Sequence, residues 1–106
     1  MALLTLPAEL LDLANGESRE FRVLRWEEGG MVIRQRQAPA GKEVTAIRMH
    51  VLPEDKPAGA PYWDATAGNL VARLRVILDD VVASRRPIRV TKHGEAPVAR
   101  HQVDFL

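Results

Sequence analysis

The chain has 106 residues, of which 46% are hydrophobic and 27% are charged, and its formal net charge is +1. This size and composition predict a single globular domain spanning residues 1–106 and exclude a disordered chain. With no cysteine, the chain has no disulfide framework, no thiol nucleophile and no cysteine-based zinc site. The longest apolar segment is broken by Asp79 and Asp80 and no signal-peptide pattern opens the chain, so we expect no membrane span and a cytoplasmic location.

The first half of the chain predicts a short helix followed by three strands. Residues 6–14 begin with Leu-Pro and stop at Asn-Gly, which suits a short N-terminal helix. Residues 21–26 and 31–35 form strand-prone runs on either side of Glu-Glu-Gly-Gly, which predicts a hairpin because glycine tolerates the positive φ of tight turns. A turn at 38–41 and a third strand at 45–51 follow.

The second half predicts a loop, one long helix and a closing hairpin. The proline-rich stretch 53–61 predicts the loop, and Tyr-Trp after it predicts a hydrophobic staple at the helix entrance. The helix is expected to be capped by Asp64 or Thr66 and stopped by Pro87. Its apolar stripe consists of Leu70, Leu74, Ile77, Leu78 and Val81. Two strands, 88–92 and 98–105, close the chain around Gly-Glu-Ala-Pro.

The element order is helix, three strands, helix, two strands. This order predicts a mostly β fold with α+β character. A five-stranded oligonucleotide/oligosaccharide-binding (OB) barrel, β-β-β-α-β-β, has this order, and a curved antiparallel sheet with the helix across one face fits it equally.

Catalytic and metal-binding patterns are weak. The only serines, Ser18 and Ser84, lie outside any Gly-x-Ser-x-Gly elbow. His93 and His101 flank the closing turn, but two imidazoles without a placed carboxylate make a poor metal site, and His101 fits a hydrogen-bonded position at the core edge. We therefore expect no enzyme, catalytic residue, metal or cofactor, with a histidine-based hydrolase as a distant alternative.

Charge is distributed unevenly along the chain. Residues 1–20 carry four acidic side chains against one basic, whereas residues 21–52 carry six basic against three acidic, and residues 85–106 carry five basic against two acidic. Strand alternation predicts that Ile47 and Met49 face the core while Arg48 faces away from it.

Strand alternation in the other predicted strands likewise predicts a sheet face that carries basic side chains and one tryptophan. Cations interleaved with aromatic side chains on a sheet are typical of sequence-tolerant single-strand binding. The predicted nucleic-acid-binding residues are Trp26, Arg34, Arg36, Arg48, Arg89, Lys92 and Arg100.

Three alternatives stay open. Arginines on an exposed strand face can be solvated decoration, and Trp26 belongs to the core if its strand has the other register. A protein-interaction or assembly module, such as a homodimer joined through sheet edges or through the leucine-rich N-terminal segment, needs no nucleic acid.

Two segments of the chain carry a resemblance to a known group of proteins. They are Pro-Tyr-Trp-Asp at 61–64 and Thr-Lys-His-Gly-Glu-Ala-Pro-Val-Ala-Arg-His at 91–101. Together with the barrel-like element order, they loosely resemble small phage-type single-stranded-DNA-binding proteins with an OB fold. The resemblance implies a barrel whose strand face and loops hold single-stranded DNA.

Overall fold

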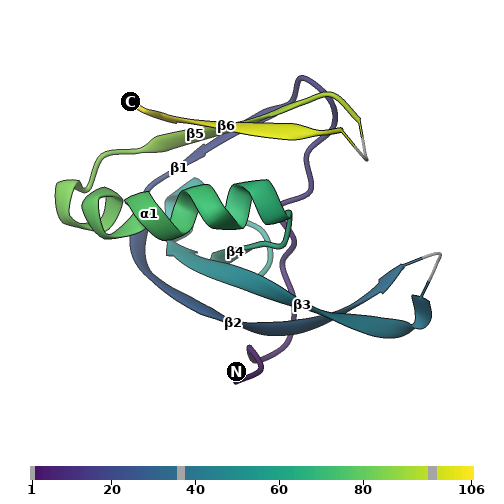
Figure 1. The fold of residues 1–106 in the computed structure, drawn as a ribbon. Helices are drawn as coiled ribbons and strands as arrows, with labels where there is room; N and C mark the ends of the chain where they lie inside the picture. Colours follow the sequence, from purple (N-terminus) through teal and green to yellow (C-terminus); the bar gives the residue numbers. More distant parts are fainter. Residues whose placement is uncertain (1, 36–37, 96–97) are drawn as a thin grey trace.

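The protein folds into two three-stranded antiparallel sheets with one long helix, and the computed structural model describes residues 2–35, 38–95 and 98–106 (Figure 1). The first sheet has the order β1-β5-β6, with β1 (Ser18–Phe21), β5 (Ile88–His93) and β6 (Arg100–Phe105). The second has the order β2-β3-β4, with β2 (Val23–Gln35), β3 (Ala38–Val51) and β4 (Tyr62–Ala65). The predicted mostly β class is confirmed, whereas the predicted five-stranded OB barrel is wrong, because the described strands form two sheets of three and no closed barrel.

The strands divide into two sheets because the first predicted strand is interrupted at Arg22. Its guanidinium and its backbone N–H both donate to the Asp55 carboxylate, at 3.0 Å each. Asp55 ends a short 3₁₀ turn, Pro53–Asp55, in the predicted loop. This anchor redirects the chain, so that Phe21 pairs with β5 while Val23 pairs with β3.

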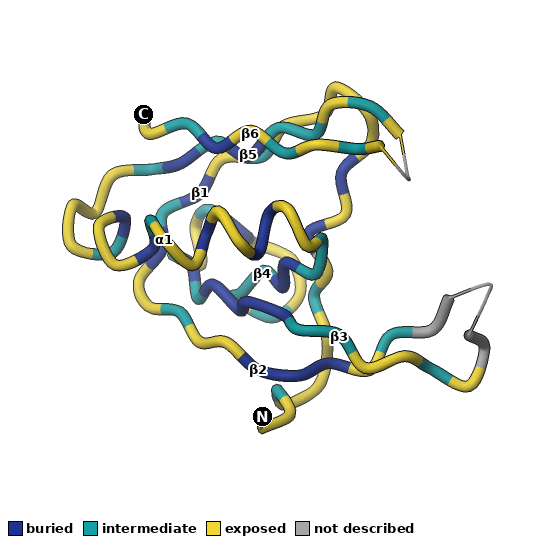
Figure 2. The backbone as a smooth tube through the Cα atoms, viewed as in Figure 1, coloured by how far each residue is buried: buried dark blue, intermediate teal, exposed yellow. Residues whose placement is uncertain are grey.

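Helix α1 (Gly68–Ser84) lies between the two sheets, as Figure 1 shows. Its buried residues are Leu70, Val71, Leu74, Leu78 and Val81, which confirms most of the predicted stripe. Buried residues from both sheets join them in one core, and Figure 2 shows burial concentrated where the helix faces the sheets. The helix ends at Arg85, in the left-handed conformation, before Pro87. The predicted side-chain cap is wrong, because Ala67 occupies the N-cap and Asp64 lies in β4.

The predicted N-terminal helix does not form, and residues 2–13, called the leader below, are extended instead. The leader forms parallel bridges with the edges of β2 and β4. Leu4 N–H donates to the Gly30 backbone carbonyl at 2.9 Å, and Leu11 N–H donates to the Asp64 backbone carbonyl at 2.9 Å. Alternating Leu11 and Leu13 are buried in the core. A helix of this length has little stability by itself, so sheet-edge hydrogen bonds and leucine burial favour the extended form.

The predicted Gly-Gly turn is also wrong, because Gly29 and Gly30 lie within β2. A Cβ at Gly29 would lie 2.8 Å from the Ala2 carbonyl oxygen and 3.0 Å from the Leu4 side chain. The two glycines therefore allow the leader to pass close to the β2 backbone. The expected turn at 38–41 is likewise part of β3, which contains the predicted third strand.

The closing hairpin is confirmed. In its register, Val90 pairs with Val103 and Lys92 pairs with His101, so these four side chains share the inward face. In the described part of the chain, no helix is both long enough and apolar enough to cross a membrane.

Candidate functional site

The seven predicted binding residues do not form one surface. The clearest correction concerns Arg48, which was expected to face solvent and is 2% exposed. Its Nε donates to Asp64 Oδ1 at 2.7 Å and its Nη2 donates to Asp64 Oδ2 at 3.1 Å. Asp64 faces Arg48 directly across the β3–β4 ladder.

The leader explains why Arg48 is buried. It crosses the outer face of the β2-β3-β4 sheet, and Thr5 Oγ1 accepts a hydrogen bond from Arg48 at 3.2 Å. The guanidinium also lies 4.0 Å from the centre of the Tyr62 ring, whose hydroxyl donates to the Pro7 carbonyl. Arg48 therefore holds the leader to the sheet and cannot contact a nucleic acid in this conformation. The predicted hydrophobic staple at the entrance of the helix is also wrong, since Tyr62 belongs to β4 and packs on Arg48.

Trp26 faces the helix instead of solvent. A register shift between Val23 and Arg25 reverses the alternation of β2, so Trp26 pairs with the buried Met49. Its indole N–H donates to the Asp79 carboxylate of α1 at 2.9 Å. The bulge thus gives Trp26 a structural contact, as the alternative register had allowed.

The remaining predicted cations are in different environments. Arg89 Nε lies 3.1 Å from the Glu20 carboxylate on the outer face of the β1-β5-β6 sheet. Arg100 is exposed on that same face. The Arg34 side chain and the whole of Arg36 lie outside the described residues. Lys92 faces inward and lines a cleft.

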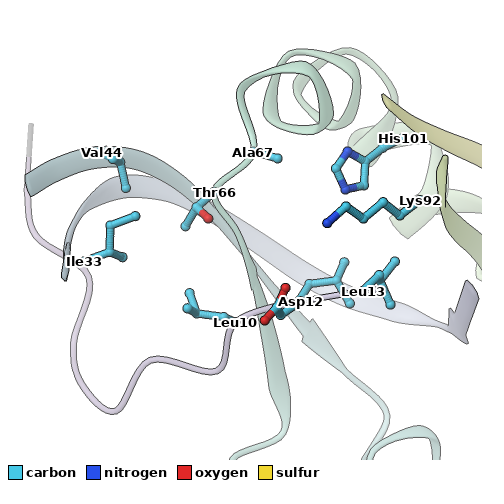
Figure 3. A pocket seen from close by; sticks show the side chains of 10 residues that line it. Leu10, Asp12, Leu13, Ile33, Val44, Thr66, Ala67, Lys92 and His101 are labelled. Carbon is cyan, nitrogen blue, oxygen red and sulfur yellow. The ribbon is translucent and has the colours of Figure 1, made fainter. Parts of the chain in front are cut away.

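This cleft, of about 340 Å³, opens between the β2–β3 hairpin and the β5–β6 hairpin (Figure 3). Its residues come from the leader, both hairpins and the link into α1. They are Leu10, Leu11, Asp12, Leu13, Ile33, Val44, Thr66, Ala67, Lys92 and His101. Figure 3 shows Lys92 and His101 on one wall, and Ile33 and Val44 on the other. Its volume is at the lower end of the range typical of ligand sites.

The charges around the cleft are mostly unneutralised. No ion pair in the described part of the chain includes Lys92 or Lys42. Lys42 pairs with Ile33 across β2 and β3, which places it on the same face of the hairpin as the cleft residues Ile33 and Val44. Asp12, exposed on the leader, is the acidic group among the lining residues.

His101 adds a titratable group to the cleft. Burial, and then the neighbouring Lys92 charge, lower the pKa of His101 below its usual 6.5. Asn69 Nδ2 donates to the Ala99 carbonyl at 2.7 Å, so Asn69 Oδ1 accepts from His101 Nδ1 at 2.8 Å. The second proton must therefore bind at Nε2. The ring is largely neutral at pH 7 and becomes a cation on acidification.

Sequence reasoning identified Lys92 as a binding residue, and its expectation of a hydrogen-bonded His101 at the core edge is confirmed, but it missed the other cleft residues. Ile33, Val44 and Leu10 are ordinary apolar residues in the sequence, and Lys42 lies between the expected turn at 38–41 and the expected strand at 45–51. Only the pairing of distant segments brings them together. Within the described residues, no group of three or more His, Cys, Asp or Glu side chains is arranged to hold a metal ion.

Comparison of the chain with protein-family models, curated proteins and solved structures gives no match. The function is therefore argued from the geometry of the cleft.

Proposed function

We propose that the protein binds single-stranded nucleic acid in the cleft between its two long hairpins. The proposal rests on the arrangement of two lysines from opposite hairpins: Lys92 lines the cleft, and Lys42 lies on the same face of its hairpin as the cleft residues Ile33 and Val44. Lysines without ion pairs attract phosphates, and an apolar surface between them receives the faces of unpaired bases. The interface differs from the sheet face expected from the sequence, and Lys92 is common to both.

The chemistry of the cleft favours a single strand over a duplex. A duplex keeps its base faces stacked inside the helix, so it offers phosphates and cannot use Leu10, Ile33 and Val44. These side chains are aliphatic, and each base gains less from them than from an aromatic platform. We therefore expect sequence-tolerant binding with a Kd in the micromolar range. Such a Kd corresponds to a binding free energy on the order of −8 kcal/mol.

Asp12 and His101 adjust this affinity. The Asp12 carboxylate repels phosphates, so Asp12→Asn should strengthen binding. Protonation of His101 adds a positive charge beside Lys92, so affinity should rise as the pH falls below 6.5, through the lowered pKa of His101.

The test is fluorescence anisotropy with labelled single-stranded DNA, single-stranded RNA and duplex DNA of equal length, titrated across a salt series. Lys42→Ala combined with Lys92→Ala should weaken single-strand binding about tenfold or more. The log–log salt slope should fall by about 0.7 for each phosphate that is no longer neutralised. The matched control is Arg25→Ala, which removes an exposed cation of β2 that does not line the cleft.

A second variant tests the apolar wall. Val44→Glu places a carboxylate in that wall. It should weaken single-strand binding more than it weakens duplex binding. Equal affinity for single strand and duplex, or equal losses with Arg25→Ala and the double lysine variant, would contradict the proposal. Absence of single-strand binding by the wild-type protein at low salt would also overturn it.

A further inference from the structure

The outer edge of β6 has free backbone hydrogen-bonding groups. Leu106 N–H donates to the Pro87 carbonyl at 3.0 Å, and this bond sets the alternation of the β5–β6 ladder. Gln102 and Asp104 therefore bond to β5, while the backbone groups of His101, Val103 and Phe105 point away from it. In the described part of the chain, β6 is an edge strand with no neighbour on that side. Such an edge is a template for another strand.

The charges along β6 are complementary to those of a second copy of the same strand. If two β6 strands pair antiparallel with Gln102 opposite Gln102, Arg100 of each copy lies opposite Asp104 of the other. This register also places the free backbone groups of His101 opposite those of Val103. The pairing thus supplies hydrogen bonds and two ion pairs at once.

Helix α1 has the same self-complementary charge order on the flank beside β6. The hydrogen bonds from Asn69 to Ala99 and His101 identify that flank. At about 100° per residue, Arg73 and Asp80 lie on the Asn69 side of the helix, with Val76 between them. Val76 is 79% exposed, and the ion pairs within the described part of the chain include neither Arg73 nor Asp80.

Two such helices, packed antiparallel about Val76, would bring Arg73 of each copy to Asp80 of the other. The helix runs alongside β6 in the fold, so one two-fold axis can serve both elements (Figure 1). A symmetric dimer requires this kind of self-complementary patch.

We propose that a second copy of this chain docks on β6 and α1, joining the two β1-β5-β6 sheets into one six-stranded sheet. The dimer uses the backbone edge of β6 and the outer flank of α1, and His101, whose side chain lines the cleft, contributes only its backbone groups to the dimer. The proposal is therefore independent of nucleic-acid binding.

Sedimentation velocity of the full chain, at about 10 to 500 µM, tests the dimer. The monomer has a mass of 11.8 kDa and the dimer has twice that mass, so the method separates them. Arg73→Asp sets like charges opposite each other and should raise the dimer Kd at least about tenfold. Arg73→Asp combined with Asp80→Arg restores opposite charges and should return the Kd to near the wild-type value. Arg25→Asp, a reversal on β2, is the matched control and should leave the dimer intact.

Phe105→Pro tests the strand edge separately. It removes a backbone N–H that β5 does not use, so the monomer fold should persist by circular dichroism while the dimer weakens. A wild-type protein that stays monomeric throughout the concentration range overturns the proposal. So does a dimer that tolerates Arg73→Asp and Phe105→Pro as well as it tolerates Arg25→Asp.

Discussion

The two sheets use positive charge in opposite ways. In the β2-β3-β4 sheet, Arg48 is sealed between Asp64, Tyr62 and the leader, where it is 2% exposed. On the outer face of the β1-β5-β6 sheet, Arg100 is exposed and Arg89 pairs with Glu20 at the surface. The strand pattern gives both sheets polar residues opposite their core faces. The difference teaches that a covering segment, more than alternation, decides whether a cation is structural or available to a ligand.

The largest expected effect comes from breaking the buried pair. Arg48→Ala leaves the Asp64 carboxylate buried without its main partner and should lower the free energy of unfolding by about 3–5 kcal/mol. Arg100→Ala, the matched change on the open sheet, should alter it by less than about 0.5 kcal/mol. Urea unfolding followed by circular dichroism measures both. Similar losses for the two variants would show that Arg48 is not sealed as described.

The leader itself offers the next contrast. Leu13 is 3% exposed and Leu6 is 79% exposed, although both are leader leucines. Leu13→Ala should cost about 2–4 kcal/mol through reduced burial and the remaining cavity. Leu6→Ala should cost less than about 0.5 kcal/mol. A helical leader lying free of the core would make both substitutions mild, so equal small effects in thermal unfolding would contradict the extended, docked leader.

A smaller effect is expected at Trp26. Trp26→Phe removes the hydrogen bond to Asp79 and should destabilise the fold by about 1 kcal/mol. Single-strand affinity should stay within about twofold of wild type, because the ring faces α1 and not the cleft. The two readouts are urea unfolding and the anisotropy titration. A large loss of affinity with unchanged stability would return Trp26 to the binding interface.

The smallest expected effect is the pH dependence contributed by His101. Because the folded pKa is lowered below 6.5 by burial and Lys92, the unfolded chain binds the proton more readily. This contribution to stability is therefore complete above pH 6.5 and is lost as the pH falls through the folded pKa.

The control for this prediction is His101→Gln, which should flatten the stability profile just below pH 6.5. A separate loss is expected at lower pH, where Asp55 titrates, because hydrogen bonding from Arg22 holds the pKa of that carboxyl below 3.8. If the stability profiles of His101→Gln and wild type coincide just below pH 6.5, the imidazole is not buried in the cleft wall.

Local patterns in the sequence determined the elements whose stability comes from their own residues. The α1 stripe, its end before Pro87, the closing hairpin and the third strand all follow from periodicity and turn chemistry. These features need no knowledge of distant partners, since the pattern of one segment defines the face that it must bury.

Only the tertiary structure decided the rest. The leader is extended because the edges of β2 and β4 offer it hydrogen bonds, and Gly29 sits in a strand because the leader passes over it. Arg48 is buried because residues 16 positions later in the chain and at the N-terminus close around it. The cleft likewise exists only where two hairpins and the leader meet. Such contacts between distant segments depend on which edges remain free after the sheets form, and no local pattern records that.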